Sequence, residues 1–379
     1  MKVEAFNYPC PSCGAPQVYS PSLQKLECDF CKTQTAIPTT SHQKHSYNQA
    51  VPGIQENTKD TKCKKCGASF EEPSYTIASI CPYCKTPTLT NPTNDIPIDG
   101  VIPFKITHKK AQQLFKEWVG SLWFAPTAFT KYLDGDNKLN GIYLPHWSFD
   151  TQTSTHYSGA RGDAYYVYVD KVITDQNGNR RVVQVQERRI RWTPVSGVVY
   201  GNFQEISTPA SKHIDKAIVD ALASWDYQEL KGFTHKFLSG FEAQEYTSSI
   251  EQGFEDIKQK LAPHIRQKII IDIGGDAQQI HSITTKYSDI KYQNNLYPVW
   301  SASFKWNNKE YDYAINAQTG KVSGERPYSI IKIASAIAGV IAILVALYYI
   351  GQIPQVQEFL SNLQSNSQIS SYHYNYEYR

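Results

Sequence analysis

The chain has 379 residues, enough for two or three domains and too many for a single small module. Its 38 Lys and Arg residues stand against 35 Asp and Glu residues, so no overall charge excess marks it as a nucleic-acid coat or as an enzyme for acidic substrates. Hydrophobic residues make up 41% and aromatic residues 13%, a composition typical of a globular protein and not of a disordered one.

The eight cysteines all fall in Cys-x-x-Cys pairs, and the pairs form two sets with the same spacing, C-x2-C-x14-C-x2-C. In both sets a Gly follows the first pair and a Lys follows the second, at an offset of 53 residues, which indicates an internal duplication. The first set is Cys10, Cys13, Cys28 and Cys31, and the second is Cys63, Cys66, Cys81 and Cys84.

Each set can arrange four thiolates tetrahedrally around one Zn2+, the geometry of a closed structural site. A segment of about 30 residues is too small to fold on its apolar core alone, so a metal would supply the folding energy. We expect no secretory signal peptide, because residues 1–10 lack an apolar core, and this favours metal over disulfides. Four thiolates leave no open position for a catalytic water. We therefore predict zinc ribbons over residues 1–40 and 61–95, with two structural Zn2+ ions as cofactors.

Nucleic-acid binding is the alternative use of such ribbons. Residues 1–90 contain nine Lys and seven acidic residues, which is a weak positive charge for a phosphate-binding surface. We therefore favour a protein-docking or structural role for the ribbons.

Residues 41–60 are polar, lack periodicity and contain a Pro-Gly pair, which predicts a linker in which His42 and His45 are solvated. Residues 96–328 alternate helical and strand patterns and predict a mixed α+β body. Its predicted helices run from Thr107 through Trp118, from Ser207 or Thr208 through Leu222 with Pro209 in the first turn, and from Ile250 through Ile265 with a kink at Pro263.

Alternating patterns predict two β-hairpins in the body. One covers residues 165–192 and turns at Asn177-Gly178, and the other follows Tyr297 and turns at Asn307-Asn308. The segments Leu144-Pro-His-Trp147 and Tyr297-Pro-Val-Trp300 resemble each other, so the body could consist of two related α+β units.

The body shows no motif that predicts an enzyme. It contains neither a G-x4-G-K-[ST] phosphate loop nor a G-x-S-x-G or H-E-x-x-H motif. His146 and His156 are interpreted as packing or surface residues, and Asp272 to Asp276 as a helix-to-strand turn. The five arginines of residues 180–192 are interpreted as a charged hairpin edge, with contact to an anionic surface as the alternative.

Residues 330–353 predict a transmembrane helix. From Ile333 to Ile353 the chain has 21 residues without a charge, enough to span about 30 Å of hydrocarbon. Basic residues gather before it, so the positive-inside rule predicts a cytoplasmic N-terminal part, a single pass through the inner (plasma) membrane and an extracytoplasmic, polar, Tyr-rich tail over residues 354–379. Ala334, Ala338, Ala342 and Ala346 form a small-residue face that predicts lateral packing in a homo- or hetero-oligomer.

Several runs resemble a group of bacterial membrane proteins: WFAP from Trp123, YLPHW from Tyr143, IGGD from Ile273, YPVW from Tyr297 and NAQTGKVSGERPYS from Asn316. This is the family of TFIIB-type zinc-ribbon-containing membrane proteins, often labelled primosomal protein N′-like, or replication factor Y, superfamily II helicase. The resemblance implies a membrane-tethered scaffold whose partners are membrane proteins of the phage-shock or flotillin-like envelope-stress systems. The helicase part of the label has no phosphate-loop motif to support it.

The sequence thus predicts a non-enzymatic, membrane-anchored scaffold that interacts with other membrane proteins and with the bilayer. The alternative is a membrane-associated, replication-related protein that binds nucleic acid through its ribbons.

Overall fold

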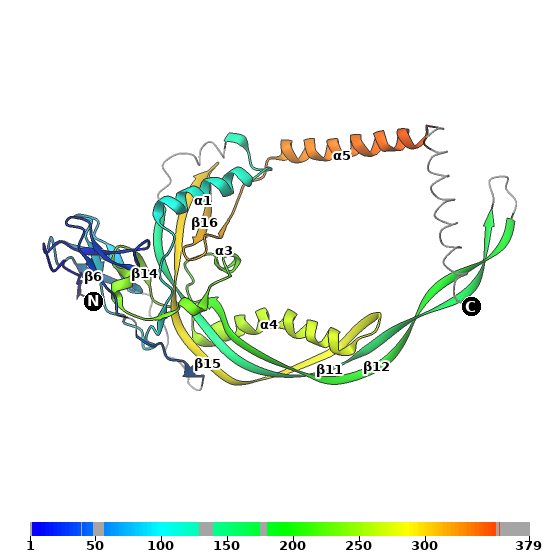
Figure 1. The fold of residues 1–379 in the computed structure, drawn as a ribbon, viewed down its shortest axis with the longest axis horizontal. Helices are drawn as coiled ribbons and strands as arrows, with labels where there is room; N and C mark the ends of the chain where they lie inside the picture. Colours follow the sequence, from blue (N-terminus) through cyan, green and yellow to red (C-terminus); the bar gives the residue numbers. More distant parts are fainter. Residues whose placement is uncertain are drawn as a thin grey trace, which may run out of the picture. The chain divides into compact units, whose positions relative to one another are not determined.

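The computed structural model describes residues 2–38, 40–47, 57–128, 139–174, 180–353 and 356 (Figure 1). These residues form two compact units. The first contains the described residues up to Phe115 and those from residue 139 to Glu325, and the second contains residues 116–128 and those from Arg326 onward. Both helices and strands occur in the first unit, so the predicted α+β class is confirmed.

The main sheet of the first unit is built on two long antiparallel strands, β11 (Asn140–Thr174) and β15 (Ala277–Trp306). Strand β12 (Arg180–Pro209) pairs with the other edge of β11, and β16 (Lys309–Asn316) pairs with the other edge of β15. The two similar sequence segments lie side by side in this arrangement, with Leu144 directly opposite Tyr297. Figure 1 shows helix α4 (Ile250–Ile273) lying across the concave side of these strands.

The main sheet contains an internal repeat of short strand, helix, long strand and returning strand. The first copy is β10 (Gly100–Val101), α1 (His108–Ser121), β11 and β12, and the second is β14 (Glu242–Gln244), α4, β15 and β16. The short strand of each copy pairs in parallel with the long strand of the other copy, β10 with Asn295 and Leu296, and β14 with Ile142 and Tyr143. Each repeat therefore completes the sheet of the other.

Equivalent hydrogen bonds reinforce this exchange. The indole of Trp147 donates to the carbonyl of Ser248 at 3.1 Å, and the indole of Trp300 donates to that of Ile106 at 2.8 Å. The amides that follow β12 and β16 likewise donate to Pro145 and Pro298, at 2.8 and 2.9 Å. Because these bonds recur at matching positions of the two copies, they support the hypothesis of two related units.

The helices bury their apolar faces on the sheet. From α4, Phe254, Ile257 and Leu261 pack with Trp147 and Phe149 in one buried cluster. Gly253 lies directly against the Trp147 ring, since a Cβ at Gly253 would come within 2.6 Å of the indole Cδ1. Phe115 of α1, in the first copy of the repeat, stacks on Tyr313 of β16, with ring centroids 4.0 Å apart.

The remaining elements are short. The strands are β1 (Lys2–Glu4), β2 (Gln17–Ser20), β3 (Lys25–Cys28), β4 (Gln34–Thr35), β5 (His45–Ser46), β6 (Thr58–Lys62), β7 (Ser69–Pro73), β8 (Thr76–Ile80), β9 (Pro87–Leu89), β13 (Lys231–Gly232) and β17 (Val322–Gly324). The short helices are α3 (Lys216–Ala221) and the 3-10 turns η1 (Tyr227–Glu229) and η2 (His235–Leu238). Strands β2, β3 and β4 form one small sheet and β1, β6 and β7 another, whereas β8 and β9 extend the main sheet through β14.

Most predicted elements are present. Helices α1 and α4 lie where the periodicity predicts them, with Pro263 inside α4. The first predicted hairpin is β11–β12, although its Asn177-Gly178 turn lies outside the described residues. Asn307 and Asn308 have φ values of 46° and 63°, as a two-residue turn of type I′ between β15 and β16 requires.

The predicted start of the second helix is wrong. Thr208 and Pro209 belong to strand β12, where they pair with Trp147 and His146. Helix α3 begins after Asp215, whose carboxylate accepts a hydrogen bond from the amide of Ala217 at 2.7 Å. Proline is favourable in the first turn of a helix, but it is equally acceptable at the end of an edge strand. Pro209 is in a strand because this part of the chain pairs with β11.

In the second unit, Ser329 is the N-cap of α5 (Ile330–Gly351), and its hydroxyl accepts a hydrogen bond from the amide of Lys332. Within the described part of the chain, residues 330–350 form one helix long and apolar enough to cross a membrane, with a mean hydropathy of 2.6. The tail over residues 354–379 lies outside the described residues except for residue 356.

We predict that Gly253→Ala lowers the free energy of unfolding by about 1–3 kcal/mol, because the new methyl group must displace the Trp147 ring. Gly120 of α1 is the matched control, since a Cβ there would meet no atom within 4 Å. Gly120→Ala should therefore raise the free energy of unfolding by about 0.5–1 kcal/mol through helix propensity. Chemical denaturation of both variants in detergent tests this, and a stabilising effect at Gly253 would show that α4 does not approach Trp147 as described.

Candidate metal centres

The four sulfur atoms of each cysteine set converge. Within each set all Sγ atoms lie within 4.8 Å of one another, so each could hold one metal ion. In the first cluster Cys10 is 3.4 Å from Cys31 and Cys13 is 3.5 Å from Cys28. The second cluster is slightly wider, with 3.7 Å between Cys63 and Cys84 and 3.8 Å between Cys66 and Cys81. These spacings match the edge of about 3.8 Å expected for four thiolates at 2.3 Å from a tetrahedral Zn2+.

The four Cys-x-x-Cys loops share one backbone geometry. In each loop the carbonyl of the first cysteine accepts from the amide four residues later, at 2.9–3.0 Å. The amide of the same cysteine donates to the carbonyl five residues later, at 2.7–3.0 Å. Both sulfur atoms of a pair are thereby held on the same side of a closed turn.

The residue that closes each loop has a left-handed backbone. Gly14 and Gly67 have φ values of 74° and 75°, as the glycine at these positions predicts. Lys32 and Lys85 occupy the equivalent positions of the second loops with φ values of 61° and 58°. A lysine costs about 1–2 kcal/mol in this conformation, and in both loops it directly follows the last cysteine of the cluster.

Two threonines that the sequence analysis did not identify contact the sulfur ligands. The Thr33 hydroxyl lies 3.1 Å from Cys31 Sγ, and the Thr86 hydroxyl lies 3.3 Å from Cys84 Sγ. A hydroxyl at this distance can donate to the thiolate and stabilise it, which lowers the pKa of Cys31 and that of Cys84 to about 6. Since a thiol binds metal as the thiolate, both contacts favour binding. The tripeptide Cys-Lys-Thr, which occurs at the end of both cysteine sets, was the sequence signal that could have identified these threonines.

The duplication of the clusters extends to strand register. Strand β3 pairs with β4 through Leu26↔Thr35, and β8 pairs with β9 through Ser79↔Thr88, the same pairing 53 residues later. Beyond this hairpin the two copies differ, because β8 also pairs with β14 of the main sheet.

Both clusters are attached to the body. The amide of Tyr19 donates to the carbonyl of Ser239 at 2.8 Å, and the hydroxyl of Ser239 donates to the carbonyl of Gln17 at 2.6 Å. After the second cluster, the buried carboxylate of Glu245 accepts from the amides of Thr93 and Asn94 at 2.8–3.0 Å. The clusters therefore belong to the same compact unit as the main sheet.

The described residues of the predicted linker also contact the body. Strand β5 pairs with β15 at Lys291 and Tyr292. His45 Nε2 lies 2.7 Å from a carboxylate oxygen of Asp99, and His42 lies 2.9 Å from the Gln293 amide. The expectation that both histidines are merely solvated is wrong, because Asp99, just before β10, and Gln293 of β15 supply a polar partner for each.

His146 and His156 of the body lie far apart and in different surroundings. His146 is buried and stacks on Tyr297 with ring centroids 4.2 Å apart, and burial lowers its pKa to about 3, which keeps it neutral at physiological pH. His156 is exposed ten residues further along the extended strand β11, about 30 Å away. The structure does not bring the two together.

Asp272 and Asp276 stabilise the connection between α4 and β15. Asp272 accepts a hydrogen bond from the Tyr157 hydroxyl at 2.6 Å, and Asp276 accepts from the amide of Ala164 at 2.7 Å. Their roles match the interpretation as a helix-to-strand turn.

The arginine-rich segment lies on a two-stranded extension of the sheet. Pairing between β11 and β15 ends at Gly162 opposite Ala277, and the β11–β12 hairpin continues alone, as Figure 1 shows. There Arg191 lies over the Tyr165 ring at 5.3 Å, and Arg188 lies 3.8 Å from Asp276. Tyr166, Tyr168 and Val172 of the hairpin are exposed.

The chain is similar in sequence to a bacterial protein of comparable length. No family model matches the chain, and no solved structure matches it. The chain is 25% identical over 340 residues to the uncharacterized protein YdjG of Bacillus subtilis strain 168, an alignment that covers 88% of this chain and 94% of that protein. The similarity extends over nearly the whole length of both chains, and it assigns no activity.

Proposed function

We propose that this protein is a non-enzymatic, membrane-anchored scaffold in which two zinc ribbons present docking surfaces to other membrane proteins. The observation that carries the proposal is that both four-cysteine clusters are built into the same compact unit as the main sheet. A single unit of this kind can hold two binding surfaces at a fixed distance and orientation from each other. The resemblance to TFIIB-type zinc-ribbon membrane proteins is part of the same proposal.

Zinc is the metal that the donor set fits best. Four cysteine sulfurs with tetrahedral spacing favour Zn2+ over the oxygen-preferring cations. The eight cysteines would be the ligands, and the ions would stabilise the short β2–β4 and β6–β9 segments, whose own cores are small. A centre closed by four thiolates has no position for a substrate, which agrees with a structural role.

Two exposed aromatic residues are the candidate docking contacts. Phe30 lies between Cys28 and Cys31 and is 83% exposed, and Tyr83 lies between Cys81 and Cys84 and is 67% exposed. They occupy equivalent positions of the two clusters, 53 residues apart. Exposed aromatics on a rigid loop are typical of residues that dominate the energy of a protein interface.

Helix α5 would anchor the protein in the bilayer. None of its apolar window is buried in the protein, and the 21 residues of the span 330–350 match the hydrocarbon thickness. Lys321, Arg326 and Lys332 lie on its N-terminal side, so the first unit would face the cytoplasm and the chain after α5 would lie outside. The small-residue face of α5 would contact another helix, and the resemblance suggests phage-shock or flotillin-like envelope-stress proteins as partners.

A membrane-associated nucleic-acid-binding protein is the second candidate. Phe30 and Tyr83 could stack on unpaired bases, and Lys32 and Lys85 follow them closely. The balanced charge of the chain makes this the weaker candidate.

Metal analysis of the purified chain should return two Zn2+ per protein, and Cys63→Ser should reduce this to one because three thiolates bind the ion far more weakly. Tyr83→Ser in the same cluster is the matched control and should retain both ions, since Tyr83 is not a ligand. A well-folded protein without zinc would refute the assignment.

A polarisation titration of the full chain in nanodiscs with single- and double-stranded DNA separates the two functions. The scaffold proposal predicts no binding tighter than about micromolar at physiological salt. The whole chain is needed because residues 1–95 pair with the body through β8 and Ser239. Tighter, salt-sensitive binding that Phe30→Ala and Tyr83→Ala together abolish would favour the nucleic-acid function instead.

A further inference from the structure

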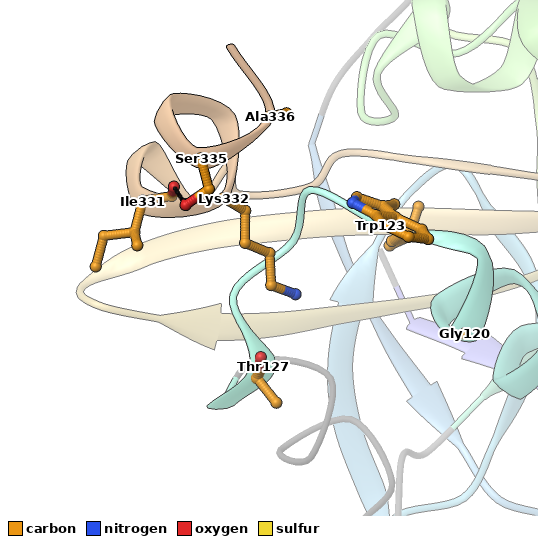
Figure 2. Close-up of a pocket in the computed structure, with 8 residues that line it drawn as sticks. Gly120, Trp123, Thr127, Ile331, Lys332, Ser335 and Ala336 are labelled. Carbon is orange, nitrogen blue, oxygen red and sulfur yellow. Dashed lines mark hydrogen bonds between the residues drawn. The ribbon is translucent and has the colours of Figure 1, made fainter. Parts of the chain in front are cut away.

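A short aromatic segment is fixed against the first turn of α5 within the second unit. The amide of Ser329 donates to the carbonyl of Phe124 at 2.7 Å, and the ammonium group of Lys332 donates to the carbonyl of Ala125, also at 2.7 Å. Next to these contacts lies an open cavity of about 630 Å3, lined from one side by residues 120–127 and from the other by residues 331–336. Figure 2 shows Trp123 and Lys332 on its two sides.

Large apolar side chains in the lining of this cavity, and Ile330 next to it in the chain, are in contact with solvent. Trp123 is 79% exposed, Ile330 is 82% exposed and Ile331 is 79% exposed. A soluble surface seldom gathers such residues, and here they continue into the apolar surface of α5. Tryptophan next to the end of an apolar helix is typical of the membrane interface, where its ring lies among the headgroups.

The lining of the cavity includes one cation and two hydroxyl-bearing side chains, Lys332, Thr127 and Ser335. Lys332 is the charged residue among those that line it, and Ser335 adds a hydroxyl one turn further along α5. The ammonium group has three protons, of which the contact with Ala125 uses one. It can therefore also bind an anion beside the Trp123 ring. The chemistry combines an apolar wall, an aromatic edge and a single cation.

We propose that this cavity binds an anionic phospholipid of the inner leaflet, with its phosphate on Lys332 and its glycerol and upper acyl chain against Trp123 and Ile331. The proposal rests on the proposed function, since it requires α5 to span the bilayer. It adds a lipid-binding site at the point where the helix enters the membrane. Charge complementarity and continuity with the apolar face of α5 identify the occupant as a lipid. A free phosphate would gain nothing from the apolar wall.

The test uses the full chain in vesicles of equimolar phosphatidylcholine and phosphatidylglycerol, with brominated acyl chains on one lipid or on the other. The fluorescence of Trp123 is the difference between the wild-type protein and Trp123→Phe. We expect bromine to quench this difference signal, and brominated phosphatidylglycerol to be preferred about fivefold, as one cation at an anionic surface predicts. Trp192→Phe, which removes an exposed indole from the first unit, controls for the loss of a tryptophan.

The variant Lys332→Gln should remove the preference for phosphatidylglycerol and leave the quenching by phosphatidylcholine intact. Lys116→Gln removes the same charge from an exposed position of α1 and should keep the preference. Equal quenching by the two brominated lipids in the wild-type protein, or loss of the preference in both lysine variants, would overturn the specific site.

Flotation of the same vesicles in high salt separates this proposal from the one on which it rests. If the protein does not float with the vesicles, the membrane anchor itself is refuted. If it floats and Trp123 is not quenched, the anchor stands and the lipid-binding cavity is refuted.

Discussion

The first unit depends on the exchange of short strands between its two repeats. Strand β10 of the first repeat pairs with β15 of the second, and β14 of the second pairs with β11 of the first. The indoles of Trp147 and Trp300 close the same exchange with hydrogen bonds to the chain that precedes the helix of the other repeat. Each repeat alone would expose one edge of its long strand and leave these buried carbonyls unpaired, which costs about 1–3 kcal/mol for each group. We therefore expect the two copies to be stable only together.

This frame positions the two cysteine clusters. Strand β8 extends the sheet from β14, and the first cluster is bound through Tyr19 and Ser239, close in sequence to the same strand. The segment around β14 thus supports both clusters and one of the exchanged strands. Phe30 and Tyr83 thus belong to clusters that are bonded to the main sheet. For the docking role that we propose, such attachment is favourable, because preorganised contacts lose less entropy when a partner binds.

Features with a local cause could be predicted from the sequence. The cysteine spacing gave both clusters, helical periodicity gave α1 and α4, and two asparagines gave the turn between β15 and β16. Features fixed by distant partners could not. Pro209 is in a strand because β11 pairs with it, and His45 is ordered because Asp99 and β15 are beside it. The similarity of the two Pro-x-Trp segments indicated a repeat, but no sequence pattern shows that their short strands are exchanged.

Hydrogen exchange at increasing denaturant concentration tests the exchange of strands most directly. If neither repeat can open alone, the most protected amides of β11 and those of β15 should converge on one unfolding free energy and one denaturant dependence. The amides of β10 and β14 that pair with them should follow the same curve. Two separate curves, one for residues 100–209 and one for residues 242–316, would mean that the repeats fold independently, and would contradict the structure at its centre.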